Sequence, residues 1–134
     1  MKNSLKEKIY AQGYPDAKTA PIVSLEDFFE ADVEESSIGC NLLEHPGIFT
    51  FHKILFNIRS KINVQDVFVE IMEIEDDLIF SERIYILTDS HISEIIQWIE
   101  PLQPTEIDEG YTFGKPSLAP ELRADYKVFS VWWD

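Results

Sequence analysis

The stretch that decides the fold is residues 46–88, PGIFTFHKILFNIRSKINVQDVFVEIMEIEDDLIFSERIYILT. Its first part holds apolar residues at spacings of three and four, the repeat of one helical face: Ile48, Phe51, Leu55, Ile58 and Ile62. Residues 64–74 and 84–88 are instead rich in β-branched side chains, and the acidic residues 75–77 separate them. The stretch therefore predicts a helix followed by an antiparallel hairpin.

A second helix is expected after the hairpin, with Ser90 as its N-cap and Pro101 limiting its length. Its apolar stripe consists of four isoleucines: Ile92, Ile95, Ile96 and Ile99. Residues 126–133 end the chain as an aromatic-rich strand. Before residue 46, residues 21–23 read as a short strand, and Ser24 is placed to cap a short helix by accepting from Asp27.

The resulting order is strand, helix, strand, strand, helix, strand. This order predicts an α+β fold of the ferredoxin-like βαββαβ type, an antiparallel sheet with two main helices on one face. The length of 134 residues suits a single domain, residues 1–134. Residues 24–45 would be an insertion, and 101–125 a long loop. For residues 1–20, a flexible segment and a short helix near residues 5–11 both stay open.

The strong strands carry apolar residues on both sides, which is unusual for a sheet with one wet face. Phe68 and Met72 alternate with Val67 and Val69, and Trp132 neighbours Trp133. Something must therefore cover the face opposite the helices. Four covers are considered: the insertion at 24–45, the connection at 101–125, a second copy of the chain, or a different partner.

Charge is the most unusual property of the composition. Lys and Arg number 11 against 25 Asp and Glu, so the formal net charge is −14. Such a surface repels phosphate backbones and anionic membranes, which argues against nucleic-acid and membrane partners. A basic protein would be attracted quickly and in a salt-dependent way. The simpler interpretation, that the charge only maintains solubility, has about equal weight.

The leading hypothesis is a non-enzymatic interaction protein that binds a basic protein partner. Small acidic immunity and inhibitor proteins are similar in size and charge, and this similarity of composition implies such a role. Acidic side chains would steer the partner and an aromatic side chain would supply affinity. The predicted partner-binding residues are Glu26, Asp27, Glu30, Glu34, Glu35, Glu73, Asp76, Asp77 and Trp133.

Two alternatives belong to other classes. In one, the chain is a small-molecule binding or catalytic domain, and 101–125 is a lid over a pocket. The candidate pocket residues are Glu70, His45, Tyr111 and Phe113. Glu70 interrupts a central strand, so it is either a buried carboxyl with a raised pKa or, as we favour, a group that faces solvent or pairs with Arg83 across the hairpin. In the other alternative, the open sheet face forms a homodimer.

Few residues suit metal or nucleophilic chemistry. His45 and His52 are seven residues apart, whereas helical metal pairs use spacings of three or four. No cofactor, metal or catalytic residue is predicted, and the role of Cys40 stays open. With one cysteine, no disulfide within the chain is possible, and no stretch has the apolar length of a membrane helix. A cytoplasmic location is expected.

Overall fold

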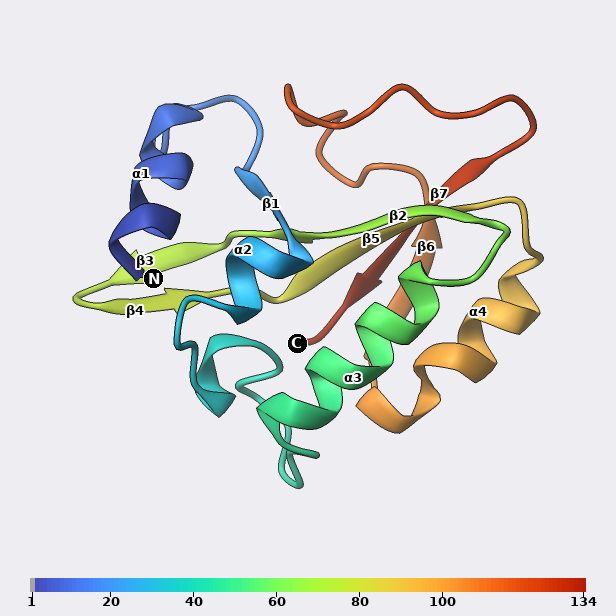
Figure 1. Cartoon of the computed structure of the whole chain (residues 1–134), viewed down its shortest axis with the longest axis horizontal. Helices are drawn as coiled ribbons and strands as arrows, with labels where there is room; N and C mark the ends of the chain where they lie inside the picture. The colour runs from blue at the N-terminus through green and yellow to red at the C-terminus, as the bar shows by residue number, and fades with distance from the viewer. Residues whose placement is uncertain (1) are drawn as a thin grey trace.

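The computed structural model describes residues 2–134, apart from the side chain of Lys2. Five strands form one sheet in the order β1-β2-β5-β7-β6, and every neighbouring pair is antiparallel (Figure 1). The elements are α1 (Lys2–Ala11), β1 (Ile22–Ser24), α2 (Leu25–Phe29), α3 (Ile48–Arg59), β2 (Val64–Glu70), β3 (Glu73–Glu75), β4 (Leu78–Phe80), β5 (Arg83–Thr88), α4 (Ile92–Ile99), β6 (Glu106–Glu109) and β7 (Lys127–Trp132), with 3₁₀ turns at Glu35–Ser37 and Glu100–Leu102.

The α+β class and the antiparallel sheet agree with the prediction, but the strand order differs from a ferredoxin-like sandwich. That fold places its first strand inside the sheet, between two other strands. Here β1 is an edge strand and pairs with β2 alone. The reason is local: Ser24 ends β1 by capping α2, with its Oγ accepting from the Asp27 N–H at 3.0 Å. Only three residues are left for pairing.

The two main helices form where their apolar repeats predict, with differences at the ends. In α3, Phe51, Leu55 and Ile58 are buried, whereas Ile62 lies beyond the end of the helix and is 96% exposed. In α4, His91 is the N-cap in place of Ser90, and its ring accepts from the Ser93 N–H at 3.2 Å. Ile95 and Ile99 are buried in the core, but Ile96 is 49% exposed.

From Asp66 onward in β2, and along β5 and β7, side chains alternate between the two faces of the sheet. Val67, Val69, Ile84, Ile86 and Val131 belong to the main core, which Phe51 and Leu55 of α3 and Ile95 of α4 complete. The residues between them form a second cluster on the opposite side: Ile22, Phe68, Tyr85, Leu87 and Val128. In Figure 1, α2, α3 and α4 all lie below the sheet.

The outer face, the one opposite these helices, is covered by the chain itself. Residues 110–126, here called the covering segment, run above the sheet in Figure 1. Tyr111 and Ala119 pack against the second cluster. The Gln65 side chain donates to the Glu121 carbonyl at 2.7 Å and accepts from the Arg123 N–H at 2.8 Å. Of the four covers considered, the 101–125 connection is the one observed, and it also contains strand β6.

The N-terminal segment forms the helix that was one of its two predicted states. Leu5 and Ile9 of α1 are buried in the main core. Gln12 follows α1, and its side-chain amide bonds both backbone groups of Ile22, donating to the carbonyl at 2.8 Å and accepting from the N–H at 2.9 Å. These are the groups of β1 that point away from β2. The amide therefore closes this edge of the sheet.

Candidate functional site

A buried charged pair lies on the outer face, beneath the covering segment. Glu70 of β2 and Arg83 of β5 are direct cross-strand partners, and each is 9% exposed. Arg83 Nε lies 3.4 Å from Glu70 Oε2, and the Tyr85 hydroxyl donates to Glu70 Oε1 at 2.7 Å. Both expectations for Glu70 are therefore met, since the carboxyl is buried and also pairs with Arg83.

The covering segment closes over the guanidinium group of Arg83. Arg83 Nη1 donates to Thr112 Oγ1 at 2.8 Å and to Ser130 Oγ. The Phe113 and Trp132 rings flank the same group, with their centroids 5.5 and 5.8 Å from its central carbon. A guanidinium held by several acceptors and aromatic rings fixes the segment to the sheet.

Burial controls the ionisation of this group of residues. Burial raises the pKa of the Glu70 carboxyl, while the Tyr85 hydroxyl and Arg83 act in the opposite direction. Burial and the neighbouring Glu70 also raise the pKa of Tyr85. Among the described side chains, no buried nitrogen or oxygen atom lacks a hydrogen-bond partner. Because every buried donor and acceptor has a partner, Glu70, Tyr85 and Arg83 form a hydrogen-bond network that stabilises the fold.

Three of the four predicted pocket residues meet at this network: Glu70, Tyr111 and Phe113. The Tyr111 ring packs on Tyr85 with centroids 5.0 Å apart. His45 lies elsewhere, where its Nε2 bonds the Ile38 carbonyl at 2.7 Å and its ring packs on Phe51. It connects the loop before α3 to the main core. Thr112 and Ser130 were missed, because contacts between distant segments have no periodic sequence signal.

The predicted partner-binding role of Trp133 is wrong for this conformation. Its side chain is 1% exposed and lies in the main core, against the Phe51 ring. The indole N–H donates to the Leu102 carbonyl at 2.7 Å. Since the two terminal tryptophans point to opposite faces, one had to enter the core, and Trp132 is the one that faces outward.

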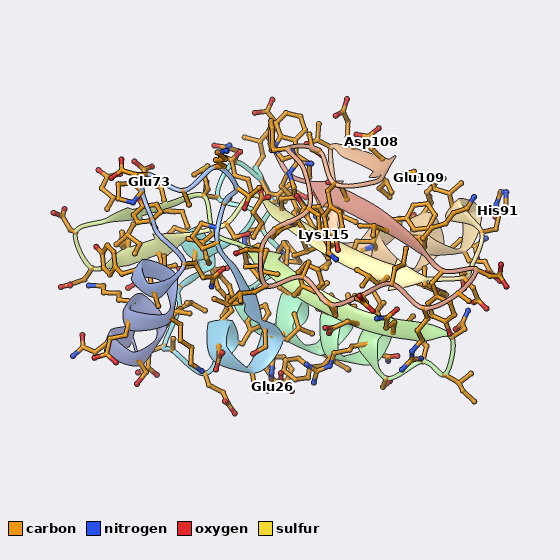
Figure 2. The ribbon with its side chains drawn as sticks, turned by 90° about the horizontal axis from the view of Figure 1, so that it is seen from above. Glu26, Glu73, His91, Asp108, Glu109 and Lys115 are labelled. Carbon is orange, nitrogen blue, oxygen red and sulfur yellow. The ribbon has the colours of Figure 1, made fainter. Side chains whose placement is uncertain are left out.

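Three of the predicted partner-binding carboxylates form ion pairs within the chain. Glu26 pairs with both terminal nitrogens of Arg59, and this pairing lowers the pKa of Glu26. The other pairs are Asp27 with Lys8 and Asp77 with Lys6, both at 2.8 Å. Glu35 Oε1 lies 3.6 Å from His45 Nδ1, a nitrogen that accepts from the Gly47 N–H. Glu30, Glu34, Glu73 and Asp76 are exposed. Figure 2 shows Glu26 and Glu73 on different sides of the molecule, so these residues do not form one patch.

A different acidic surface forms where α4 lies beside the edge strand β6. We call it the acidic edge and define it by Ile96, Glu100, Glu106, Ile107 and Asp108. A hollow of about 370 Å³ separates the helix from the strand and is lined by Ile96, Pro104 and Ile107 among others. Within residues 2–134, none of the three carboxylates forms an ion pair. In Figure 2, Asp108 lies on the side of the molecule opposite Glu26.

The backbone of β6 is open on the side away from β7. Gly110 N–H donates to the Val128 carbonyl at 2.7 Å, and bonded pairs alternate along an antiparallel ladder. The N–H and C=O groups of Ile107 and Glu109 therefore point outward. The alternation of Glu106, Ile107 and Asp108 is the sequence signal that could have identified this strand.

Other kinds of site have little support in the part of the chain that the structure describes. No three His, Cys, Asp or Glu side chains there are placed to hold a metal ion together. Cys40 is an exposed residue, but partial burial of its thiol and the nearby Glu82 raise the pKa of the thiol. A raised pKa disfavours the nucleophilic thiolate. Among the described helices, none is both long and apolar enough to cross a bilayer.

The fold and the site define a small acidic α+β domain whose sheet has one closed edge and one open, carboxylate-lined edge. The chain belongs to the family described as the Uncharacterized protein YfbO family, whose model matches residues 1–131. It is similar to the Uncharacterized protein YfbO of Escherichia coli (strain K12), with 33% identity over 116 residues that cover 85% of this chain and 83% of that protein. No solved structure matches the chain.

Proposed function

We propose that this protein is a non-enzymatic interaction protein that binds a basic protein partner in the cytoplasm. The observation that carries the proposal is the acidic edge, where three carboxylates without a cation in the described chain adjoin a strand with open backbone groups. This is a different surface from the predicted one. We favour it because ion pairs within the chain already offset much of the charge at Glu26, Asp27 and Asp77.

An extended segment of the partner would add to the sheet beside β6. In this mode of recognition, main-chain hydrogen bonds supply affinity, and alternate side chains supply specificity. One set of side chains would enter the hollow between α4 and β6, against Ile96 and Ile107. The other set would lie on the outer side of the sheet. Glu106 and Asp108 are on this side, because they pair with Trp132 and Ser130 of β7. A segment that alternates apolar and basic residues fits both.

A short peptide of alternating lysine and valine is a suitable probe, with binding followed by fluorescence anisotropy. We expect the affinity to fall steeply with added salt. Reversing Glu106 and Asp108 to lysine should weaken binding at least about tenfold, because like charges would then face each other. Reversing Glu30 and Glu34 is the matched control, since it changes the net charge equally on exposed residues of the predicted surface.

A second probe separates strand addition from general attraction between charges. The same peptide methylated on the backbone nitrogens that would face β6 keeps its charge but cannot complete the ladder. We expect it to bind much more weakly. Equal binding of both peptides, or equal losses in the two charge-reversal variants, would show that no specific basic segment is recognised at this edge.

The observation that suggested a homodimer was a bare sheet face, and the covering segment accounts for it. A small-molecule role keeps one specific observation in its favour, a pocket between α1 and the covering segment.

A further inference from the structure

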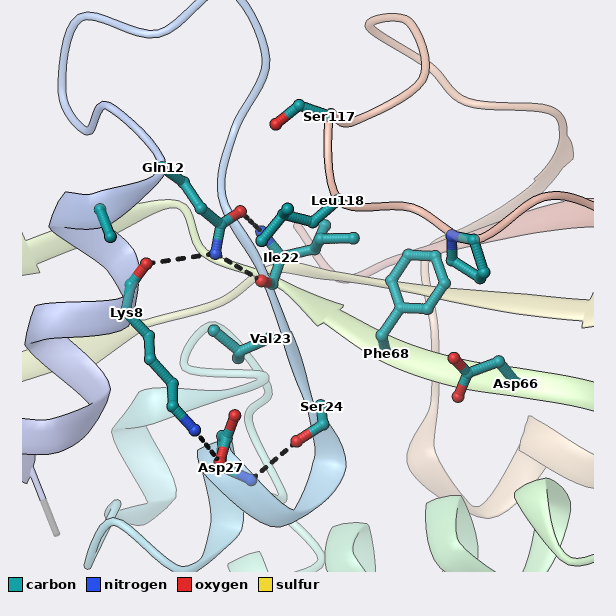
Figure 3. Close-up of a pocket in the computed structure, with 12 residues that line it drawn as sticks. Lys8, Gln12, Ile22, Val23, Ser24, Asp27, Asp66, Phe68, Ser117 and Leu118 are labelled. Atoms are coloured by element: carbon teal, nitrogen blue, oxygen red, sulfur yellow. Dashed lines mark hydrogen bonds and ion pairs between the residues drawn. The ribbon is translucent and has the colours of Figure 1, made fainter.

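A second hollow, separate from the acidic edge, lies at the other end of the sheet. It has a volume of about 590 Å³, within the range of roughly 300–1,000 Å³ found for small-molecule sites. Figure 3 shows its walls: α1 with Lys8 and Gln12 on one side, β1 along the floor, and Ser117 and Leu118 of the covering segment opposite. Ile22, Phe68, Leu118 and Pro120 make most of the lining apolar.

Two glutamine side chains hold the walls of this pocket in place. Gln12 fixes the end of α1 to β1 through its two bonds to Ile22. Gln65 fixes residues 121 and 123 of the covering segment to β2. Both clamps use the donor and the acceptor of an amide, so the pocket is formed before any ligand binds, which lowers the entropic cost of binding.

An irregularity in β2 turns a carboxylate toward this pocket. The pairing of β2 with β5 shifts register between Val64 and Asp66, which is a bulge at Gln65. After the bulge, alternation places Asp66 on the outer face together with Phe68, and Gln65 also reaches the covering segment from that face. Bulges commonly redirect side chains in this way beside functional sites.

The lining carries more negative than positive charge. Lys8 and Asp27 pair with each other at 2.8 Å on the rim (Figure 3). Asp66 is left without a salt-bridge partner: its Oδ1 accepts the Val67 N–H at 2.8 Å, and no described side chain donates to it. The charge of Arg59 also acts on Asp66, but the Arg59 guanidinium is bound to Glu26. Burial raises the pKa of this carboxyl, and a cation in the pocket would favour its charged form.

We propose that this pocket binds a small organic cation, an amine attached to an apolar body about the size of one aromatic ring. The amine would donate to Asp66, and the body would pack on Phe68, which lies beside Asp66 in Figure 3, and on Leu118 of the same lining. An anion would meet an unpaired carboxylate. A neutral analogue would gain the apolar contacts alone.

Benzylamine, benzyl alcohol and benzoate are matched probes of these three cases, titrated while the amide NMR signals of the folded chain are followed. Benzylamine should bind tightest, shifting the signals of Val67 and Leu118. Asp66→Asn keeps the oxygen that accepts from Val67 but removes the charge, so it should weaken benzylamine binding about tenfold and leave benzyl alcohol unchanged. Asp108→Asn is the control, because it removes one charge from the acidic edge.

Several results would overturn this proposal. These results are benzoate binding as tight as that of benzylamine, shifted signals that map away from the pocket, and a loss of benzylamine affinity in Asp108→Asn equal to that in Asp66→Asn. If Asp66→Asn fails to fold, Leu118→Ala replaces it: this exposed side chain should be dispensable for folding, and its loss should weaken benzylamine and benzyl alcohol alike. Unchanged affinities in Leu118→Ala would also overturn the proposal. This proposal does not require that the acidic edge binds a partner.

Discussion

The helix-facing side of the sheet and its outer side differ in how they are held. On the helix side, side chains of α1, α2, α3 and α4 interlock with Val67, Ile84 and Val131 in a core of apolar residues. On the outer side, a smaller cluster around Phe68 and Tyr85 adjoins the buried pair of Glu70 and Arg83. A helix can bury a whole apolar stripe, whereas an irregular segment supplies few apolar contacts and relies on specific hydrogen bonds.

The largest effect is expected from Arg83→Met, which removes the charge that holds the covering segment. Glu70 would be left buried without its cation, and breaking a buried pair in this way typically costs about 4 kcal/mol of unfolding free energy. Chemical denaturation measures the loss. The double variant Arg83→Met/Glu70→Gln should recover part of the lost unfolding free energy, because it no longer buries an unpaired charge. If the double variant instead lost the sum of the two single losses, Arg83 and Glu70 would not be energetically coupled.

A loss of roughly 3 kcal/mol is expected from Leu55→Ala on the helix side, where the side chain is fully buried. This loss reflects a cavity and involves no charge. It should therefore stay constant with pH, whereas the loss in Arg83→Met should shrink in acid as Glu70 takes up a proton. Chemical denaturation of both variants at several pH values measures the two losses of unfolding free energy. If both losses showed the same pH dependence, the outer face would not rely on a charged pair as described.

The smallest effect concerns Glu70 itself. Burial raises the pKa of Glu70 in the folded state, so the folded protein binds this proton more tightly than the unfolded chain does. The resulting contribution to the unfolding free energy is complete below the ordinary pKa of 4.5, and it is lost as the pH rises through the pKa of the folded state. Glu70→Gln removes this titration. The unfolding free energy of the wild type relative to Glu70→Gln should thus decline from acid to neutral pH, and a rise over that range would show that Arg83 outweighs burial.

Local repeats predicted the parts of this fold that depend on one face of one element. The spacing of Phe51, Leu55 and Ile58 predicted α3, and the alternation in β2 and β5 predicted the hairpin. The pairing of Glu70 with Arg83 was one of the alternatives that the hairpin allowed. The apolar residues on both sides of the strands also predicted that the outer face would be covered.

Strand order and the acidic edge could not be predicted in the same way. A strand that is apolar on both faces fits several positions in a sheet, so β1 was assigned a place inside a ferredoxin-like sheet. The four residues of β6 lie within a stretch rich in Pro and Gly, where their short alternation is weak evidence for a strand. Four residues surround Arg83 from the covering segment and β7, namely Thr112, Phe113, Ser130 and Trp132, and they come together only in the folded chain.

The amide of Gln12 has a consequence for assembly. Open-ended stacking of copies, as in a fibre, requires each molecule to offer two complementary growing sides. Here one edge of the five-stranded sheet is already occupied by a side chain of the same molecule, so the edge of this sheet that stays open to a further strand is the one at β6. Two copies could meet there about a twofold axis and would then stop, and the like charges of Glu106 and Asp108 oppose even that pairing.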